Sequence, residues 1–380
     1  MKLRIQVVTD LKQFVALRDA WRRLWIDSGG YIFQSHDWIT GWLVGLQGRR
    51  DARLLTVLAW DGDRLAGVIP GAVHRRRGYR VVHFAAQIFS DYCDCLIGPD
   101  YDPDVVLPLL WDGLDRAGGF DVIRLRQIPA DARCLRFFSS LARAGNACMI
   151  EPQERCLRID NQWANGALFF RSLSKKGRNN HTRGKRILTE LGGDVSFRVI
   201  EPDEPADAII YEILRLKEAW LRVNDPRSLL FGHDRVVFRT ILDSAWRSGL
   251  AKVFILQCNG RIAAASINFV YGNRMEAYFT SYDEAFERAS PGTILIVEYS
   301  KWAFDHGLKL VDFLRGEEAF KLRLVNAETP LSSVTVPRTL VGHLAILGYR
   351  HLPWRQRRRQ VADEPRAPAI VGNPVTGRAS

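Results

Sequence analysis

In the last third of the chain, the spacing of hydrophobic residues changes from a strand period to a helix period and back. Residues 274–282 (RMEAYFTSY) and 308–314 (LKLVDFL) alternate as strands do, and residues 293–306 between them carry apolar positions three and four apart. The helix start is marked by a run of small residues: Ser290, Pro291, Gly292 and Thr293. Serine suits a helix cap, proline the first turn, and glycine a close approach of a ligand to the backbone. The pattern predicts a strand–turn–helix–strand unit that binds an anion at the helix start.

A similar order of elements recurs along the chain. Hairpins are predicted at residues 53–60 with 64–73, around Asp61-Gly62, and at residues 251–258 with 261–270, around Asn259-Gly260. A strand, a loop, an apolar helix and a final strand follow each hairpin. The pattern predicts an α/β domain that is duplicated; a chance match of two α/β domains is the alternative. Further helices are predicted from about Leu11 to Asp27, after Ser35, near residues 209–220 and from Asp234 to Gly249.

Length and composition fit two globular domains. The chain has 380 residues, of which 47% are hydrophobic. It has no apolar run of the roughly 18–20 residues that span a bilayer, and the N-terminus lacks the features of a signal peptide, so a cytoplasmic location is expected. The six cysteines are scattered, and Cys93 and Cys95 form the one close pair. We expect free thiols and no metal.

The chain is basic, with a formal net charge of +12. Residues 171–186 carry seven Lys or Arg and no acid, and residues 350–359 form a second basic cluster. Such charge suits an acidic partner: coenzyme A, a nucleotide-linked sugar, tRNA or an anionic membrane. In the first segment we expect a diphosphate or RNA phosphates to bind Lys175, Lys176, Arg178 and Arg183; a solvated face is the alternative. His181 is expected at the surface, and Gly177 and Gly184 argue against one straight helix.

Polar residues near the last strand of the repeat are the candidates for chemistry. Asp312 lies within an apolar strand, where a carboxylate is either a general base or half of a structural ion pair. Glu318 and Lys321 follow the end of that strand. Lys321 is expected to bind a phosphate or an oxyanion, with a solvated lysine as the alternative. Period-two counting puts Tyr278 and Tyr282 on one side of their strand, to donate a proton or line a cleft; aromatic core packing is the other reading.

Four groups of residues resemble the GNAT-type acyltransferases of the CelD group, associated with cellulose or exopolysaccharide biosynthesis, and more distantly the Fem aminoacyl transferases. The groups are Phe33-Gln34-Ser35 with Trp38 and Trp42, Ser174-Lys175-Lys176 with Arg178, Asn180 and Arg183, the turn Ser290–Thr293, and Asp312-Phe313 with Gly316, Glu318 and Lys321. The turn lacks the arginine- and glycine-rich pyrophosphate loop of ordinary GNAT enzymes.

The resemblance implies an α/β (α+β) fold of tandem GNAT-like domains, with mixed, mainly antiparallel sheets flanked by helices. It places an N-terminal GNAT-like domain in residues 1–160 and the acyltransferase domain in residues 161–340. Residues 341–380 would form a basic, partly disordered tail. The stretch 340–359, which joins an apolar segment to a basic one, is expected either to pack on the core or to touch an anionic membrane face.

The resemblance also implies N- or O-acyl transfer from acyl-CoA, such as acetyl-CoA, to an amine or hydroxyl of a sugar or cell-envelope precursor. The implied catalytic residues are Asp312, Tyr282, Lys321 and Glu318. The coenzyme would bind at Ser290, Pro291, Gly292 and Thr293, and the acceptor at Lys175, Lys176, Arg178, Arg183 and Tyr278. Two alternatives stay open: a Fem-like transferase that uses aminoacyl-tRNA, and a non-catalytic accessory protein of polysaccharide biosynthesis.

Overall fold

The computed structural model describes residues 2–49, 52–76, 78–200, 204, 207–224, 234–318 and 320–351. Most of the predicted tail, including the basic cluster after His351, lies outside these residues. The chain forms two compact units. Unit 1 contains the chain up to Glu154, the segment that ends at Ala245 and the chain from Pro330; unit 2 contains the chain from Arg155 and the segment Trp246–Thr329. From the sequence, the boundary between the first and second domains was predicted after residue 160.

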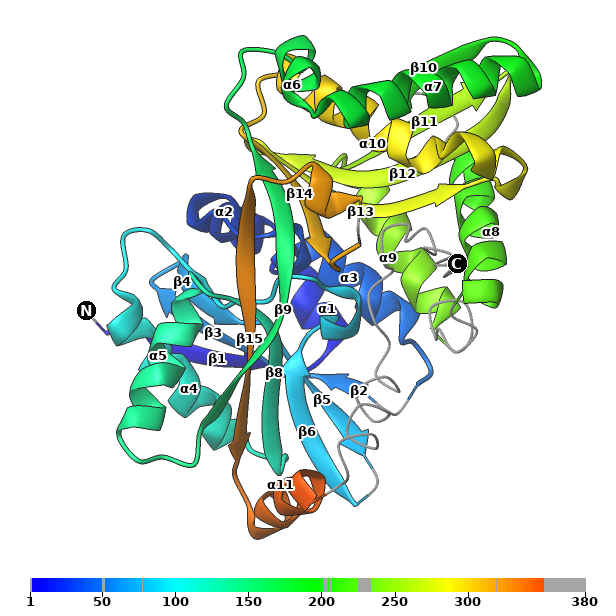
Figure 1. The fold of residues 1–380 in the computed structure, drawn as a ribbon. Helices are drawn as coiled ribbons and strands as arrows, with labels where there is room; N and C mark the ends of the chain where they lie inside the picture. Colours follow the sequence, from blue (N-terminus) through cyan, green and yellow to red (C-terminus); the bar gives the residue numbers. More distant parts are fainter. Residues whose placement is uncertain are drawn as a thin grey trace. The chain divides into compact units, whose positions relative to one another are not determined.

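Unit 1 combines two sets of strands with helices on their faces (Figure 1). Strands β1, β3, β4 and β7 form one sheet in that order, and β15, β8, β6, β5 and β2 are neighbours in another. The elements of unit 1 are β1 (Arg4–Val8), α1 (Leu11–Val15), α2 (Arg18–Ser28), α3 (His36–Gly45), β2 (Ala52–Leu54), β3 (Thr56–Asp61), β4 (Arg64–Ile69), β5 (Gly71–Arg76), β6 (Tyr79–Phe84), β7 (Leu96–Ile97), α4 (Pro103–Ala117), β8 (Val122–Pro129), α5 (Arg133–Arg143), α9 (Arg235–Arg247), β15 (Ala327–Pro337) and α11 (Leu340–His351).

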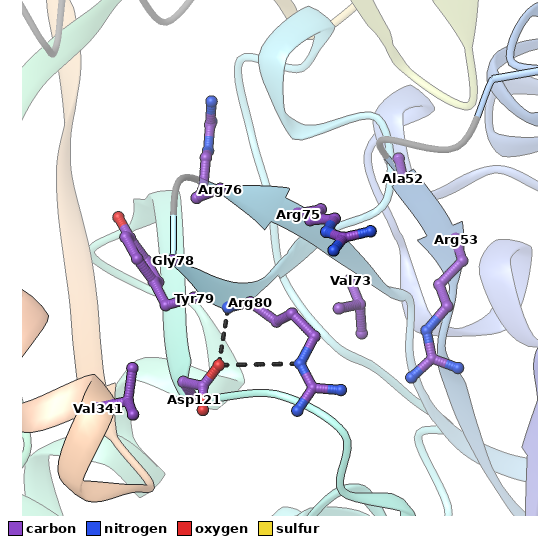
Figure 2. A pocket seen from close by; sticks show the side chains of 10 residues that line it. All are labelled: Ala52, Arg53, Val73, Arg75, Arg76, Gly78, Tyr79, Arg80, Asp121 and Val341. Atoms are coloured by element: carbon purple, nitrogen blue, oxygen red, sulfur yellow. Dashed lines mark hydrogen bonds and ion pairs between the residues drawn. The ribbon is translucent and has the colours of Figure 1, made fainter.

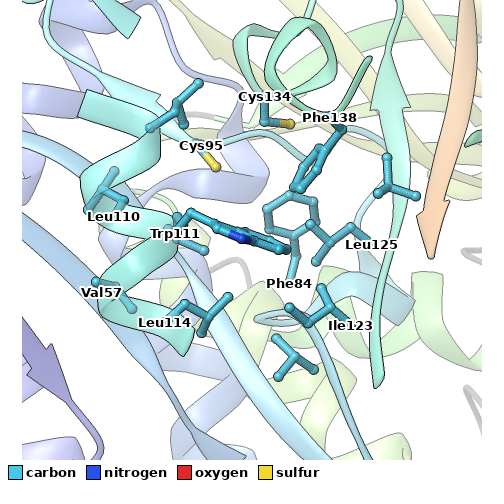
Figure 3. Packing of buried hydrophobic residues seen from close by; sticks show 14 of the residues in the cluster. Val57, Phe84, Cys95, Leu110, Trp111, Leu114, Ile123, Leu125, Cys134 and Phe138 are labelled. Atoms are coloured by element: carbon cyan, nitrogen blue, oxygen red, sulfur yellow. The ribbon is translucent and has the colours of Figure 1, made fainter. Parts of the chain in front are cut away.

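The core of unit 1 is built where α4 packs on the first sheet. Trp111 of α4 meets Phe138 of α5 edge to face, and both lie among buried aliphatic side chains of the strands (Figure 3). The starts of two predicted helices are confirmed: Asp10, just before the first, accepts a hydrogen bond from the Gln13 amide, and Ser35, just before the second, accepts one from the Trp38 amide. The first predicted helix, however, is divided into α1 and α2 at residues 16–17.

Unit 2 carries six neighbouring strands, in the order β10, β11, β12, β13, β14 and β9. All neighbours are antiparallel except β13 and β14, which are parallel. The elements are β9 (Met149–Asp160), α6 (Gly166–Ser172), α7 (Lys175–Gly192), β10 (Val195–Ile200), α8 (Asp207–Asn224), β11 (Ala251–Cys258), β12 (Arg261–Tyr271), β13 (Arg274–Tyr282), the 3-10 helix η4 (Glu284–Ala289), α10 (Pro291–Asp305), β14 (Leu310–Arg315) and the 3-10 helix η5 (Lys321–Arg323).

The predicted fold class is confirmed: sheets with mainly antiparallel neighbours are flanked by helices in both units. The predicted order of a hairpin, a strand, a helix and a strand occurs twice, as β3–β4, β7, α4, β8 and as β11–β12, β13, α10, β14. Unit 1 adds β5 and β6 after its hairpin, because Pro70 and Gly71 end β4 and begin a new strand. Among the described residues, no helix is long and apolar enough to cross a bilayer.

Candidate functional site

The site is built around the two parallel strands of unit 2. The ladder between β13 and β14 joins three residue pairs and ends where Glu276 lies beside Asp312. Strand β13 then continues to Tyr282 alongside β12, with no further ladder partner from β14 among the described residues. Helix α10 connects β13 to β14. The two strands therefore separate beside the start of this helix. The sequence predicted a ligand at this start.

The turn before α10 differs in detail from the predicted cap. Ser290 is the residue before the helix, but its backbone is left-handed (φ 53°) and its side chain accepts no hydrogen bond from a helix amide. Its carbonyl instead accepts the amides of Thr293 and Ile294 at 3.0 and 3.3 Å. Since Pro291 has no N–H, at most one amide of this first turn, that of Gly292, is available to an anion. Pro291 and Gly292 are buried.

Asp312 is buried, and its Oδ1 accepts a hydrogen bond from the Leu314 amide at 2.7 Å. The register of β14 against β9 shifts between Asp312 and Arg315, so this carboxylate spans an irregularity of the strand. The neighbouring residues Val311 and Phe313 lie in the hydrophobic cluster that α10 covers. Since successive residues of a strand point to opposite faces, Asp312 points away from α10.

Lys321 is fully buried, so the solvated lysine considered from the sequence is ruled out. Its Nζ donates to the carbonyl of Arg315 at 2.8 Å and pairs with Glu318 Oε2 at 2.9 Å. A further, longer contact reaches the Gly316 carbonyl at 3.4 Å. The ammonium group therefore closes the loop that follows β14, and Glu318 is the carboxylate that compensates its charge.

Lys217 joins this group from helix α8, and it is not among the candidates predicted from the sequence. The side chain is buried, and its Nζ lies 4.7 Å from the Trp220 ring centroid and 5.5 Å from that of Phe279. Burial lowers the pKa of Lys217 to about 7; the charge of Glu318 opposes this and that of Lys321 adds to it. Lys217 is four residues after Ile213 and three before Trp220, so a charge on the apolar face of the helix was the available signal.

A β-bulge separates the two candidate tyrosines. The register of β13 against β12 shifts at Tyr278, between the pairs Asn268–Ala277 and Ile267–Phe279. Tyr278 packs against Phe269 on one side of the sheet. Tyr282 lies instead in the cluster beneath α10 with Ala277. The prediction that both tyrosines lie on one side is therefore wrong, because a bulge breaks the two-residue period.

Burial raises the pKa of the Tyr282 phenol above its usual value, so Tyr282 is protonated at neutral pH. A protonated tyrosine has the proton that a general acid must give to a leaving thiolate.

From Lys175 onward the basic segment forms one helix, α7, contrary to the expected break. Its cap Ser174 accepts a hydrogen bond from the Gly177 amide. A Cβ at Gly184 would lie 2.6 Å from the Ala289 carbonyl oxygen, so glycine at this position permits close packing on η4. Lys175, Lys176 and Arg183 are exposed, whereas Arg178 is half-buried and donates to the carbonyls of Arg171 and Leu173.

His181 is buried rather than at the surface. Its Nε2 lies 2.9 Å from Glu298 Oε1, and Lys185 and Lys301 pair with the same carboxylate at 2.7 and 2.9 Å. Burial opposes the ionisation of Glu298. The three hydrogen-bonding partners outweigh it and hold the pKa of this carboxyl well below its usual value. This cluster joins α7 to α10, and we assign it to packing.

In unit 1, Asp94, Cys95 and Cys134 have potential metal-ligand atoms within 4.8 Å of one another. Both oxygens of Asp94 already accept backbone amides, those of Cys95 and Cys134 on Oδ1 and that of Arg133 on Oδ2. Burial raises the pKa of the Cys134 thiol, which disfavours the thiolate that binds metals. We interpret the cluster as the cap of helix α5.

Comparison with known proteins finds a family match that overlaps the candidate site. Residues 175–322 match the family model described as an acetyltransferase (GNAT) domain. Residues 175–322 form a GNAT acetyltransferase domain. This match includes α7, Lys217, β13, α10, β14 and Lys321, and the chain is an acyltransferase. No curated protein matches the sequence.

Solved structures support the fold of the whole chain. FemX is similar with a TM-score of 0.58 at 10% identity, covering 89% of this chain and 98% of that chain. The C-terminal domain of a putative lysylphosphatidylglycerol synthetase from Agrobacterium fabrum has a TM-score of 0.53 at 12% identity, covering 89% and 96%. L-PGS from Bacillus licheniformis gives 0.52 at 12% identity, covering 87% and 95%. At these identities the likeness concerns the fold.

Proposed function

We propose that the protein transfers an acyl group from acyl-CoA to an amine or hydroxyl of a sugar or cell-envelope precursor, as in the CelD group. The observation that carries this proposal is the opening between β13 and β14 inside the matched GNAT domain. An extended thioester donor can add to the unpaired side of β13 through backbone hydrogen bonds. The turn Ser290–Thr293 then receives the coenzyme phosphates, with the Gly292 amide as the donor.

The proposed reaction is direct attack of the acceptor on the thioester carbonyl, in a complex that holds both substrates. Asp312 takes the proton of the acceptor, and Tyr282 gives one to the sulfur of coenzyme A as the bond between carbon and sulfur breaks. Backbone N–H groups of β13 between Tyr278 and Tyr282 polarise the carbonyl. Lys321 and Glu318 hold the loop after β14, and Lys217 supplies a second titratable group from α8.

Exposed basic residues of α7 are proposed to bind an anionic acceptor, such as one attached to a diphosphate. Lys175, Lys176 and Arg183 carry charge without an ion pair among the described residues. Arg178, which is half-buried and bonded to two carbonyls, contributes its charge from the same helix. A cytoplasmic location would give the enzyme access to both acyl-CoA and envelope precursors.

Titration calorimetry with acetyl-CoA and longer acyl-CoAs tests the donor, and release of free coenzyme A thiol tests turnover. Binding in the micromolar range together with acceptor-dependent thiol release would support the proposal. Failure to bind any acyl-CoA, combined with a stable envelope-protein partner in a pull-down, would favour the non-catalytic accessory role.

A Fem-like transfer from aminoacyl-tRNA is the second candidate. The positive residues of α7 favour it, as does the fold shared with FemX and with a putative lysylphosphatidylglycerol synthetase. Transfer should then be lost when RNase is added to a coupled assay. Activity that survives RNase and requires acyl-CoA would exclude the tRNA donor.

A further inference from the structure

Unit 1 contains a pocket of about 650 Å³ on the strands β2, β5 and β6 (Figure 2). In the ladders, Arg53 of β2 lies opposite Val73 of β5, and Arg75 of β5 lies opposite Arg80 of β6. Because Val73 and Arg75 are two residues apart on one strand, they share a face. Arg53, Arg75 and Arg80 therefore stand on the same side of three adjacent strands, and all three line the pocket.

The arginine pocket carries more positive than negative charge. Its one acid, Asp121, accepts the Arg80 amide at 2.8 Å and lies 3.8 Å from the Arg80 guanidinium. None of the described residues forms a hydrogen bond or ion pair with the guanidinium group of Arg53 or Arg75. Like charges directly opposite each other weaken a strand pair. An anion bound among these guanidinium groups would remove that repulsion, and phosphate is one of the groups that arginine binds through paired hydrogen bonds.

Helix α11 begins at the wall of the same pocket. Thr339, which precedes the helix, donates to Asp121 Oδ1 at 2.9 Å, and Val341 is one of the lining residues (Figure 2). A Cβ at Gly342 would lie 2.0 Å from the Asp121 carbonyl oxygen, so this side of the helix is pressed onto the protein. These contacts hold the start of α11 against the pocket.

The opposite side of α11 is an apolar surface exposed to solvent. It consists of Leu340, Leu344 and Leu347, which are 84%, 67% and 49% exposed, with Val341 (47% exposed) at its edge beside the pocket. The spacing of four and three residues puts the leucines within one stripe of the helix. Single exposed hydrophobic residues are common, but three leucines in one stripe mark a surface that binds something apolar.

We propose that the arginine pocket and the apolar stripe of α11 together dock unit 1 on a membrane surface that carries anionic phospholipids. The arginines bind phosphodiester headgroups while the leucines enter the boundary between headgroups and acyl chains. A soluble phosphate compound would account for the arginines but would leave the leucines in water. The helix lies on the membrane, and two cooperating signals of this kind give stable but reversible attachment. The proposal does not depend on the acyl-transfer site, which lies in unit 2.

Sedimentation of the full-length protein with vesicles tests this docking. We expect association with vesicles that contain one-third phosphatidylglycerol, little with pure phosphatidylcholine, and release as salt is raised. The double variant Arg53→Gln/Arg75→Gln should lower the partition coefficient by about tenfold or more. Leu344→Gln/Leu347→Gln should also lower it on the anionic vesicles.

Matched variants control for charge and exposed apolar area. Arg22→Gln/Arg23→Gln removes two exposed charges from α2, and Leu191→Gln replaces a leucine that is 48% exposed on α7. Both should bind vesicles as the unmodified protein does. The proposal is overturned if these controls lose as much binding as the pocket variants, or if no vesicle association occurs. It is also overturned if glycerol phosphate in solution binds the arginines and vesicles do not, which would assign the pocket to a soluble phosphate compound.

Discussion

The carboxylate of Asp312 accepts a hydrogen bond from the backbone amide of Leu314, two residues later, and Leu314 has a left-handed backbone with φ 57°. A leucine rarely adopts this conformation, so a bonding partner is needed to hold it. Asp312 thus stabilises the irregularity of β14 at the point where the ladder to β13 ends. Asp312 therefore has a structural role beside the catalytic role proposed for it, and substitutions can separate the two.

Asp312→Asn should abolish acyl transfer while the fold persists, because the amide oxygen can still accept the Leu314 hydrogen bond but cannot take a proton. Asp312→Ala should also lower the free energy of unfolding, by about 1–3 kcal/mol, since the Leu314 amide loses its buried partner. Thiol release and urea unfolding measure the two effects. If Asn unfolds the protein, or leaves turnover intact, Asp312 is not the base.

Two glycines of α7, Gly177 and Gly184, should respond oppositely to alanine. Gly184→Ala places a Cβ 2.6 Å from the Ala289 carbonyl oxygen, a backbone atom that cannot move aside cheaply. We expect a loss of about 1–3 kcal/mol from this overpacking. At Gly177 the nearest atom is Ser174 Oγ at 3.3 Å, so Gly177→Ala should be neutral or gain up to about 1 kcal/mol of helix stability. Equal effects in urea unfolding would contradict this account of the packing of α7.

Glu298→Gln should destabilise the protein near neutral pH and have less effect in acid. In the folded state three partners hold the pKa of Glu298 below its usual value of about 4.5. A carboxyl with a lowered pKa stabilises the fold above that usual value and loses the contribution as pH falls toward its folded pKa. The difference between the two proteins in urea unfolding should therefore be constant above about pH 5 and shrink below pH 4. A difference that does not change with pH would rule out the charged cluster as its cause.

Elements whose ends are determined by the local residue pattern could be predicted from the sequence. Strand β13 has the predicted ends, and α10 starts close to the predicted residue, because alternation, a proline and a glycine mark them directly. Predictions were wrong where a contact with a residue distant in the sequence determines the local structure. The role of Gly184 depends on Ala289, which is more than a hundred positions away in the chain, and a helix propensity cannot report that contact.

Predictions for the candidate site failed for the same reason. Whether Lys321 is solvated or buried depends on how the loop after β14 folds over it, and the bulge at Tyr278 depends on its pairing with β12. Lys217 is the exception among the missed features, since a lysine among the apolar positions of α8 was visible in the sequence. A charge on the apolar face of a predicted helix indicates a buried titratable group.

Lys217→Met offers the last test, because it removes a buried charge without changing the length of the side chain much. The folded pKa of Lys217 is about 7 and its usual value is 10.5, so between these values the unfolded chain binds more protons than the folded one. The unmodified protein should therefore gain stability as pH rises through this window, by up to about 1.4 kcal/mol per pH unit from this group. The variant lacks this dependence and should be the more stable protein at pH 7 and below, with the difference narrowing toward pH 10. Urea unfolding of both proteins from pH 6 to 10 measures the slope. Parallel curves would show that Lys217 keeps an ordinary pKa and is not a titratable group of the site.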